Sequence, residues 1–580
     1  MTASRFTTGK FGKEATSNNS DSAVSSRPRG RSAYAGQGVL LASALVLLVG
    51  CAGVDQELPP LDATLYEQHI VTLSSDEFEG RKPGTAGERK TLDYLVKEFE
   101  QMGLKPGNGD SYLQPVPFVE ITPGSDTALR IGATDLRYGE DMVLWTKRLE
   151  NEINVEDSPV VFVGYGIVAP EYGWDDYAGL DVRGKTVVML INDPGFATQD
   201  PELFRGNAMT YYGRWTYKFE EAARQGAAAA LIVHDDKPAA YPWGTVQNSW
   251  MGPQLDMVAA DGNASRVDLE GWISLAAAES LFQANGSSYQ ALREAASRPG
   301  FKPMPLKERA SGLLRNLIRR GNSANVAAVL PGTERPDEFI VYMAHWDQLG
   351  RSLARTGDNI FNGALDNATG TAGLLTLARA FTQPGQAPKR SVLFLAVTLE
   401  ESGLLGSAYY AANPLVPLTQ TVAALNMDAI SWGGPTRDVT VVGSGSSQLE
   451  EYLTRAASTQ DRVVKPEPTP ENGFFFRSDH FNFAKVGVPA LYIKLGIDDR
   501  EQGEAFGRER QTAYTLNDYH KPSDEYRPGM DLRGGLEDLA LLQQIGAELA
   551  SNEDFPQWYE GSEFRAARER SFSEASTSAN

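Results

Sequence analysis

The chain has 580 residues, which is more than a single hydrophobic core usually serves, so we expect two to four domains. It carries 75 acidic and 54 basic residues, and this excess of negative charge argues against nucleic acid as a partner, because phosphate binding needs a basic surface. Cys51 is the one cysteine of the sequence, which excludes a disulfide within the chain.

The first 51 residues have the pattern of an export signal. The apolar run at 39–49 is too short to cross a bilayer, which takes about 20 residues, but it suits the apolar region of a signal peptide. The run ends in Leu-Val-Gly-Cys, which resembles a bacterial lipobox. We therefore expect residues 1–51 to be a signal peptide with a lipobox, and lipidated Cys51 to anchor the chain in the bacterial cell envelope, at the outer membrane. A plain signal peptide or an uncleaved anchor is the alternative.

Two helices are predicted over residues 62–104, the second at 87–102, where apolar side chains recur at helical spacing before Gly103. From 120 to 320 the short apolar runs are typical of buried strands. The Gly-Tyr-Gly turn at 164–166, the run DYAGLDVRGK at 176–185 and a helix leading through Gly-Ala into a strand resemble a protease-associated domain. His234 ends that strand, and we expect a structural role for it.

From residue 324 onward, strands and helices alternate. This order predicts an α/β fold, a three-layer sandwich with a mixed, mostly parallel central sheet covered by helices. The predicted strands lie at 325–330, 338–344, 391–399, 421–427, 439–443 and 490–494, and the helices near 368–382, 404–412, 446–459 and 531–551. Residues 560–580 are rich in Ser, Arg and Glu, and we expect them to be disordered.

Acidic and histidine side chains follow several of these strands, at the edge where ligands collect in such folds. Those after strands are His345, Asp347, Glu400, Glu401 and Asp428. A turn adds Asp366, and a later loop adds His520. Each has an ordinary reading when taken alone, such as a helix cap for Asp366 or solvated charges for Glu400 and Glu401. Their joint occurrence favours a metal centre.

A pair of zinc ions roughly 3.5–4 Å apart needs a bridging carboxylate, with one histidine and one further carboxylate for each ion. Counting along the chain makes Asp366 the bridge. His345 and Asp428 then hold one ion, and Glu401 and His520 hold the other. The same ligand types accept cobalt or manganese, so the metal identity stays open.

Two carboxylates remain outside this ligand set. Glu400 is a free carboxylate beside the metals, which suits the general base that takes a proton from an activated water. Asp347 lies two residues after His345, where it is suited to orient that imidazole.

Five motifs of the sequence resemble those of peptidase family twenty-eight, which includes di-zinc aminopeptidases and the glutamate carboxypeptidase type. They are His345-x-Asp347, Gly363-Ala364-x-Asp366-Asn367-x-x-Gly370, Glu400-Glu401-x-Gly403-Leu404-x-Gly406-Ser407, Asn426-Met427-Asp428 and Tyr519-His520-x-x-x-Asp524. The resemblance implies a catalytic domain at 62–118 and 324–558, with a protease-associated domain inserted at 120–320. It also implies Glu400 as the base, the five ligands assigned above, and Tyr519 as the hydroxyl that hydrogen-bonds the carbonyl oxygen in the transition state.

The expected activity is that of a zinc-dependent exopeptidase acting on peptide substrates. Aminopeptidase activity is favoured, because Arg477 is the one arginine near the motif where a carboxypeptidase of this family needs a cluster. The alternatives are a carboxypeptidase or dipeptidase, a one-zinc acyltransferase of the glutaminyl-cyclase type, and a receptor-like binding protein without catalysis. His480 is expected to line the substrate pocket and His69 to be structural. The phenylalanines at 474–476, 481 and 483 line a pocket or belong to the core.

Overall fold

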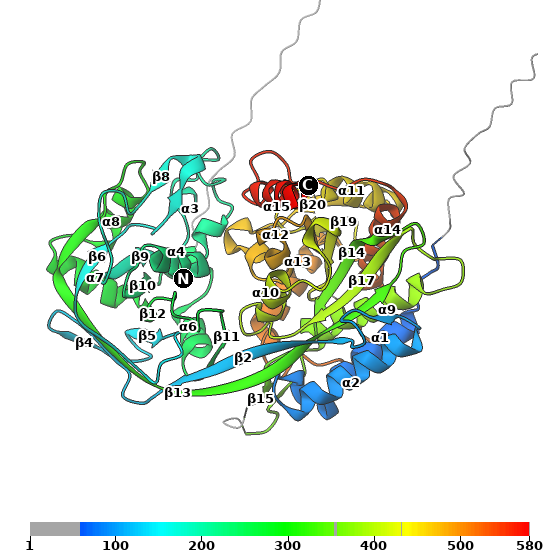
Figure 1. Cartoon of the computed structure of the whole chain (residues 1–580), viewed down its shortest axis with the longest axis horizontal. Helices are drawn as coiled ribbons and strands as arrows, with labels where there is room; N and C mark the ends of the chain where they lie inside the picture. Colours follow the sequence, from blue (N-terminus) through cyan, green and yellow to red (C-terminus); the bar gives the residue numbers. More distant parts are fainter. Residues whose placement is uncertain (1–57, 353–355, 431, 579–580) are drawn as a thin grey trace, which may run out of the picture. The chain divides into compact units, whose positions relative to one another are not determined.

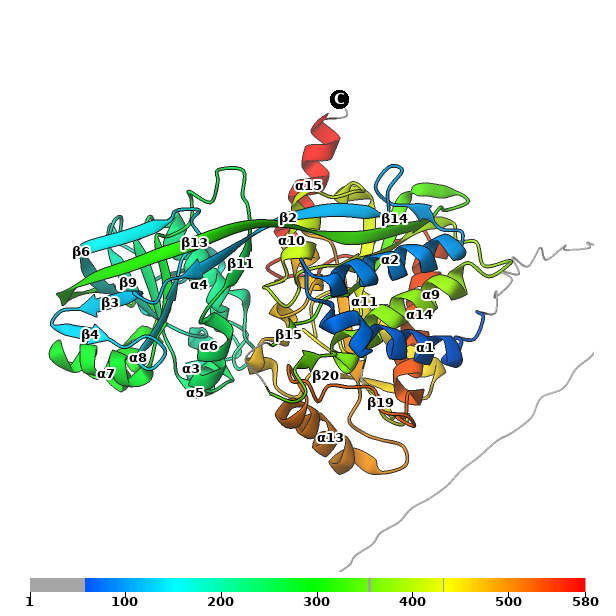
Figure 2. The same cartoon turned by 90° about the horizontal axis from the view of Figure 1, so that it is seen from below.

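The computed structural model describes residues 58–352, 356–430 and 432–578, so the predicted signal peptide and lipobox lie outside the described residues. The described residues cluster as one compact unit. Two sheets share a single strand of 27 residues, β13 (Met304–Leu330), which runs from one to the other (Figures 1 and 2). A search of the described helices finds none with the length and apolar character that crossing a membrane requires.

The inserted lobe, residues 124–315, is built on the sheet β4–β3–β13–β6–β9–β10–β12–β5. Its middle strands β6, β9, β10 and β12 are parallel, and each face of the sheet carries its own apolar core. The strands are β3 (Ala128–Ile131), β4 (Thr134–Leu136), β5 (Met142–Trp145), β6 (Glu152–Phe162), β9 (Thr186–Leu190), β10 (Ala229–Val233) and β12 (Leu269–Ile273). The helices are α3 (Pro194–Thr198), α4 (Trp215–Arg224), α5 (Asp236–Ala239), α6 (Trp243–Trp250), α7 (Leu275–Ala284) and α8 (Tyr289–Ala296).

The main lobe comprises residues 58–123 and 316–578. Its sheet order is β11–β2–β13–β17–β14–β18–β21–β19–β20, in which β17, β14, β18 and β21 are parallel neighbours. The outer strand β11 (Gln254–Met257) comes from the inserted segment. This mixed, mostly parallel sheet with helices on both faces confirms the predicted α/β sandwich. Its strands are β2 (Leu113–Pro123), β14 (Arg335–His345), β17 (Arg390–Val397), β18 (Thr421–Asn426), β19 (Asp438–Val441), β20 (Val463–Pro466) and β21 (Ala490–Leu495).

Helices cover both faces of the main sheet. The larger core lies under α1 (Ala63–Leu73), α2 (Ala86–Gln101), α9 (Gly370–Phe381), α11 (Leu449–Thr459) and α14 (Arg533–Ser551). A smaller core lies under α10 (Leu405–Ala412) and α12 (His480–Lys485) on the other face. The side chains of β17 are buried along its whole length, as expected for a parallel strand covered on both sides.

Two helices depart from the sequence predictions. Helix α15 (Arg565–Ser578) occupies much of the tail that was predicted to be disordered. It is held because Phe564 is buried, and because the buried Arg568 donates hydrogen bonds to the carbonyls of Leu418 and Thr421. Helix α13 (Gly503–Asn517) was not predicted, since Gly507 is its one buried residue and its apolar pattern is weak.

Candidate metal centre

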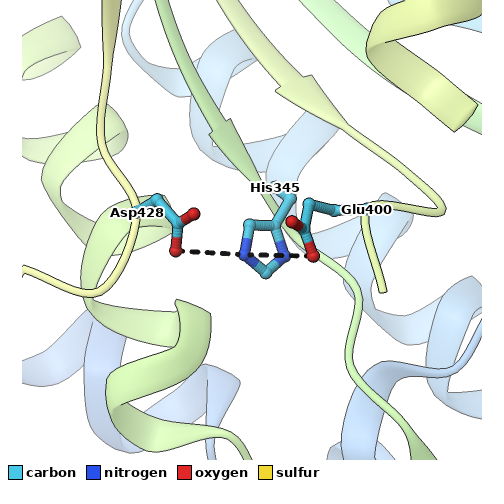
Figure 3. Close-up of side chains that lie close together, drawn as sticks. All are labelled: His345, Glu400 and Asp428. Atoms are coloured by element: carbon cyan, nitrogen blue, oxygen red, sulfur yellow. Dashed lines mark ion pairs between the residues drawn. The ribbon is translucent and has the colours of Figure 1, made fainter. Parts of the chain in front are cut away.

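Three neighbouring parallel strands bring the first group of predicted residues together. Strand β14 lies between β17 and β18, and His345 is its last residue. Glu400 and Glu401 follow the end of β17, and Asp428 follows the end of β18. Figure 3 shows the His345 imidazole between the carboxylates of Glu400 and Asp428. The carboxyl edge of the sheet therefore forms the site, as predicted for this fold class.

Asp366 and His520 complete the cluster from outside the strands. Asp366 lies in the irregular turn Ala364–Thr369 that leads into α9, and His520 lies in the loop after α13. Two groups of side chains have the spacing of a metal site: His345 with Glu400 and Asp428, and Asp366 with Glu401 and His520.

The two carboxylate oxygens of Asp366 point to different histidines. Its Oδ1 lies 3.3 Å from His345 Nε2, and its Oδ2 lies 3.3 Å from His520 Nε2. His345 Nε2 is also 3.5 Å from Asp428 Oδ1, and His520 Nε2 is 3.1 Å from Glu401 Oε2. Asp366 thus lies between His345 with Asp428 on one side and His520 with Glu401 on the other, in the arrangement expected of a bridging ligand.

These separations fit ligands of a shared metal ion. Ligand atoms about 2.0–2.1 Å from one zinc ion, arranged as a tetrahedron, lie about 3.3 Å from one another. Direct N–H···O hydrogen bonds most often measure about 2.9–3.0 Å. The Nε2 atom of His345 is buried and has no hydrogen-bond partner in the described part of the chain, and the same holds for Oε1 of Glu401. Because buried polar atoms are rarely left unpaired, and because imidazole and carboxylate are zinc ligands, the donor set fits the metal.

The electrostatics of the cluster favour a cation. Burial would lower the pKa of His345, but Glu400 raises it well above its usual value. Burial opposes ionisation of Asp366, yet the two histidines hold its pKa below the usual range. Burial raises the pKa of Glu401 to about 8 and that of Glu400 well above normal. The site therefore holds protons that bound cations would displace.

Asp347 contacts the turn of the two glutamates more closely than it contacts the imidazole. Its carboxylate accepts the backbone N–H groups of Glu400, at 3.1 Å, and of Glu401, at 3.4 Å. His345 Nδ1 lies 3.3 Å from the carbonyl oxygen of Asp347 and 3.9 Å from its carboxylate Oδ1. Burial raises the pKa of this carboxyl to about 6. The sequence predicted an orienting role towards His345, and the contacts add one towards the glutamates.

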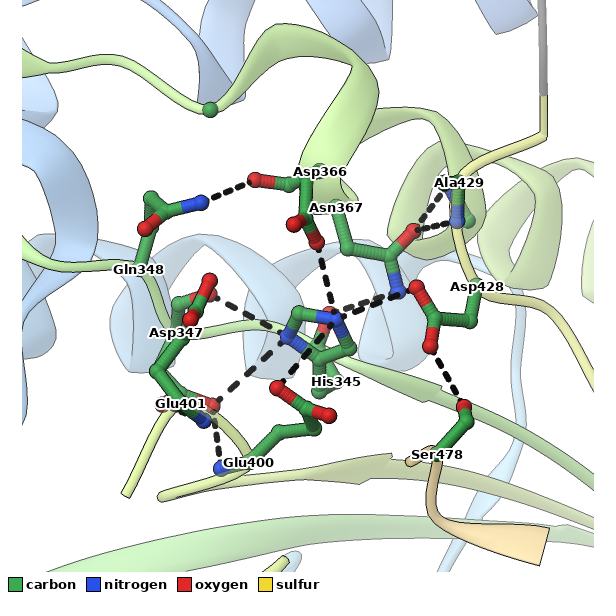
Figure 4. Close-up of polar contacts among 12 residues, drawn as sticks. His345, Asp347, Gln348, Asp366, Asn367, Glu400, Glu401, Asp428, Ala429 and Ser478 are labelled. Carbon is green, nitrogen blue, oxygen red and sulfur yellow. Dashed lines mark hydrogen bonds and ion pairs between the residues drawn. The ribbon is translucent and has the colours of Figure 1, made fainter. Parts of the chain in front are cut away.

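Two residues of the quoted motifs, Asn367 (Figure 4) and Asp524, hold ligand-bearing backbone, although the sequence suggested no role for them. The Asn367 amide donates to the carbonyl of Met427, and its oxygen accepts the N–H of Ala429. Asp524 accepts the N–H groups of Leu365, at 2.9 Å, and of Asp366, at 3.1 Å. Their fixed spacing from Asp366 and His520 is the signal that could have identified them.

Asp428 is held by a serine that sequence reasoning passed over. Ser478 donates a hydrogen bond to Asp428 Oδ2 and accepts one of 2.7 Å from Asn426 (Figure 4). Ser478 is 1% exposed, so this contact is shielded from water. It fixes one carboxylate oxygen and leaves the other facing His345.

Several non-glycine residues in the turns of the site have left-handed backbone conformations. They include Leu399 (φ 56°), directly before Glu400, Ala429 (φ 54°), directly after Asp428, and His520 itself (φ 55°). Such conformations cost roughly 1–3 kcal/mol and persist where the surrounding structure imposes them, often at functional sites. The turns that carry the predicted ligands therefore hold local strain.

Tyr519 and the remaining histidines occupy different surroundings. The Tyr519 ring stacks on His520 with 3.9 Å between centroids, and burial raises the pKa of its phenol. His480 is fully buried against Phe475 and belongs to neither of the two groups with the spacing of a metal site. His234 and His69 are buried in the inserted lobe and in α1.

The phenylalanines around His480 belong mainly to a buried apolar cluster that also contains Met209 of the inserted lobe. Phe475 and Phe476 are 6% and 4% exposed and line a cavity of about 260 Å³. Arg205 of the inserted lobe and Glu563 lie on the walls of the same cavity. Phe475 and Phe476 are thus core residues that also line this cavity, and none of the predicted metal ligands is among its lining residues.

All eight predicted site residues lie within one recognised sequence segment. Residues 325–533 match the model of peptidase family M28. The chain is 30% identical over 249 residues to aminopeptidase NAALADL1 of Rattus norvegicus, and this alignment covers 39% of this chain and 31% of that protein. It is 33% identical over 222 residues to leucine aminopeptidase 2 of Trichophyton rubrum, which covers 36% of this chain and 41% of that protein. The chain thus spans less than half the length of these two curated relatives.

A solved structure is also similar. The aminopeptidase from Aneurinibacillus sp. strain AM-1 aligns with a TM-score of 0.47 and 20% identity, over 85% of this chain and 95% of that one.

Proposed function

We propose that this protein is a zinc-dependent exopeptidase that removes N-terminal residues from peptides. The observation that carries the proposal is the position of Asp366, whose two oxygens each lie 3.3 Å from a different histidine. His345 and Asp428 would hold one zinc ion, and Glu401 and His520 the other, with Asp366 shared. When bound, the two ions would activate the attacking water and polarise the substrate carbonyl.

The residues of the chain then have separate tasks. Glu400 takes the proton of the attacking water and later delivers it to the leaving amine. Tyr519 donates a hydrogen bond to the carbonyl oxygen as negative charge develops there. Since burial raises the pKa of its phenol, Tyr519 keeps its proton at neutral pH and stays a donor.

Two observations support aminopeptidase over carboxypeptidase action. Arg477 is the one arginine near the motif where a carboxypeptidase of this family needs a cluster, and both curated relatives described above are named aminopeptidases. A panel of aminoacyl-anilides and N-blocked dipeptides tests the polarity. Hydrolysis of free-amine substrates alone is the expected result, and cleavage of N-blocked dipeptides would favour the carboxypeptidase or dipeptidase reading. Zinc analysis of loaded protein should give two ions per chain. Fewer than one would remove the basis of the proposal.

We further propose that the inserted lobe is a protease-associated domain that shapes access to the centre. Arg205 donates to the carbonyl of Ser444 at 2.8 Å, and the N–H of Met209 donates to Pro470 at 3.2 Å. These contacts join the lobe to the loops around Phe475 and Phe476, close to His480.

The proposed location is the bacterial cell envelope, with lipidated Cys51 as the membrane anchor. The basis is the lipobox pattern alone. Cys51→Ser should release the protein into the soluble fraction, and persistent membrane association of this variant would contradict the proposal.

A further inference from the structure

Arg81 is a buried arginine whose guanidinium contacts backbone carbonyls from three parts of the chain. It lies in the turn between α1 and α2 and is 1% exposed. Its Nε donates to Trp346 O at 2.9 Å, and its Nη2 donates to Gly363 O at 2.9 Å. Its Nη1 donates to Leu73 O at 2.7 Å and to Asn362 O at 2.6 Å.

Two of these segments carry predicted metal ligands. Trp346 directly follows His345, and Gly363 begins the turn that presents Asp366. The third, at Leu73, is the end of α1. One guanidinium therefore fixes the end of β14 against the turn before α9.

The charge of Arg81 is not paired in the way that two other buried arginines of the main lobe are. Arg390 and Arg462 pair directly with a carboxylate, as Arg462 does with Asp538 at 2.7 Å, whereas Arg568, like Arg81, donates to backbone carbonyls. Arg81 forms no such ion pair within the part of the chain that the structure describes. A buried ion without a direct partner is costly. The hydrogen bonds to carbonyls, together with the nearby carboxylates of Asp524, Asp347, Asp366 and Glu401, stabilise the charge of Arg81. Burial lowers the pKa of Arg81 to about 10, so it stays charged at neutral pH.

We propose that Arg81 is a positioning residue of the metal centre. By holding the carbonyl groups of Trp346 and Gly363 through one guanidinium, it sets the separation of His345 and Asp366, and through this the affinity for both ions. The inference rests on the proposed di-zinc site. Lysine cannot replace the contact, because one ammonium nitrogen cannot reach the carbonyls that three guanidinium nitrogens reach in a fixed plane.

Two substitutions and one matched control test the proposal. Arg81→Lys keeps the charge and loses the planar group, and Arg81→Met loses both. The control is Arg568→Met, because Arg568 is also 1% exposed and also donates to backbone carbonyls, at 2.8 Å. Its partners Leu418 and Thr421 lie at the opposite end of β18 from Asp428.

The measurement is the zinc dissociation constant, by competition with a chromophoric chelator, on protein shown to be folded by circular dichroism. Both Arg81 variants should bind zinc about 10–100-fold more weakly than wild type, the loss typical when a group that orients metal ligands is removed. The visible spectrum of the cobalt form should shift with them. Arg568→Met should lose thermal stability and keep the wild-type zinc affinity.

Each result decides the question. A folded Arg81→Met protein with wild-type zinc affinity overturns the inference. A wild-type zinc affinity of Arg81→Lys also contradicts it, because the positive charge of residue 81, and not the planar guanidinium, would then maintain the zinc affinity. If Arg81→Met does not fold, the zinc affinity of Arg81→Lys is the test. If Arg81→Lys also fails to fold in the presence of zinc, Arg81 has a purely structural role and the inference is wrong. Absence of zinc binding by the wild-type protein would contradict the proposed function itself.

Discussion

Replacing Glu400 with glutamine separates proton transfer from metal binding. The amide has the shape of the carboxylate, but it cannot take up a proton from water. Loss of a general base usually lowers a rate about 10²–10⁴-fold, which is about 3–5 kcal/mol of transition-state stabilisation. We expect kcat to fall by this amount in Glu400→Gln.

Zinc content should be unchanged in the same variant. Glu400 Oε2 lies 4.0 Å from His345 Nε2, whereas the proposed ligands Asp366 and Asp428 lie 3.3 and 3.5 Å from the same nitrogen. Glu401→Gln is the matched control, because Glu401 Oε2 lies 3.1 Å from His520 Nε2. This neighbouring variant should lose both activity and one zinc ion.

The metal-free proteins provide a second readout. Burial among other carboxylates raises the pKa of Glu400 well above its usual range, so its ionised form is unfavourable without cations. The folded state therefore has to hold Glu400 in its protonated form, a cost that the neutral glutamine of Glu400→Gln does not have, so this variant should raise the melting temperature of the chelated protein. Steady-state kinetics, metal analysis and thermal unfolding are the three assays. A wild-type kcat for Glu400→Gln, or the loss of a zinc ion from it, would refute the reasoning.

Three further outcomes are expected. Chelation with EDTA should lower the melting temperature of wild type, because a ligand at 100 times its dissociation constant stabilises the folded state by about 2.7 kcal/mol; an unchanged melting curve would contradict a structured metal site. Asp524→Asn leaves the N–H of Leu365 or Asp366 facing an amide donor, so a loss of about 1–3 kcal/mol in unfolding free energy is expected from denaturant titration. Burial lowers the pKa of His69 to about 4 from an unfolded value of about 6.5, so the folded state disfavours its protonation. The contribution of neutral His69 to the unfolding free energy is complete above pH 6.5. About 3 kcal/mol of it is lost as the pH falls from 6.5 to 4. In equilibrium unfolding, the unfolding free energy of His69→Gln should fall less than that of wild type between pH 6.5 and pH 4. An equal fall in both proteins would argue against a buried neutral histidine.

The sequence was sufficient to predict that the site residues directly after strands lie close together. Strands β14, β17 and β18 are apolar runs, and parallel strands present their carboxyl ends at one edge, so His345, Glu400 and Asp428 could be expected to meet. Asp366 and His520 depended on motif spacing, because irregular turns carry no periodic signal.

Residues that act through the backbone of distant segments could not be predicted. Arg81 is more than 260 positions from Trp346 in the sequence, and its partners are carbonyl groups that every residue type offers. Helix α15 illustrates the same difficulty, because its polar composition indicates disorder, whereas the burial of Phe564 and Arg568 depends on the main lobe. Tertiary contacts decided both cases.

Strand β13 makes the register of one lobe depend on that of the other. It pairs with β6 near its start, with β2 in its middle and with β17 near its end. Successive side chains of a strand point to opposite faces, so a slip of one residue along β13 would exchange buried and exposed positions in the inserted lobe. In the main lobe, where β13 is buried on both faces, the same slip would exchange side chains between the two cores. Ala310 and Leu314 would leave the core of the inserted lobe at the same time as Val326 and Ala328 left the core beneath the metal centre. An error in pairing in either sheet is thus opposed by the apolar packing of both.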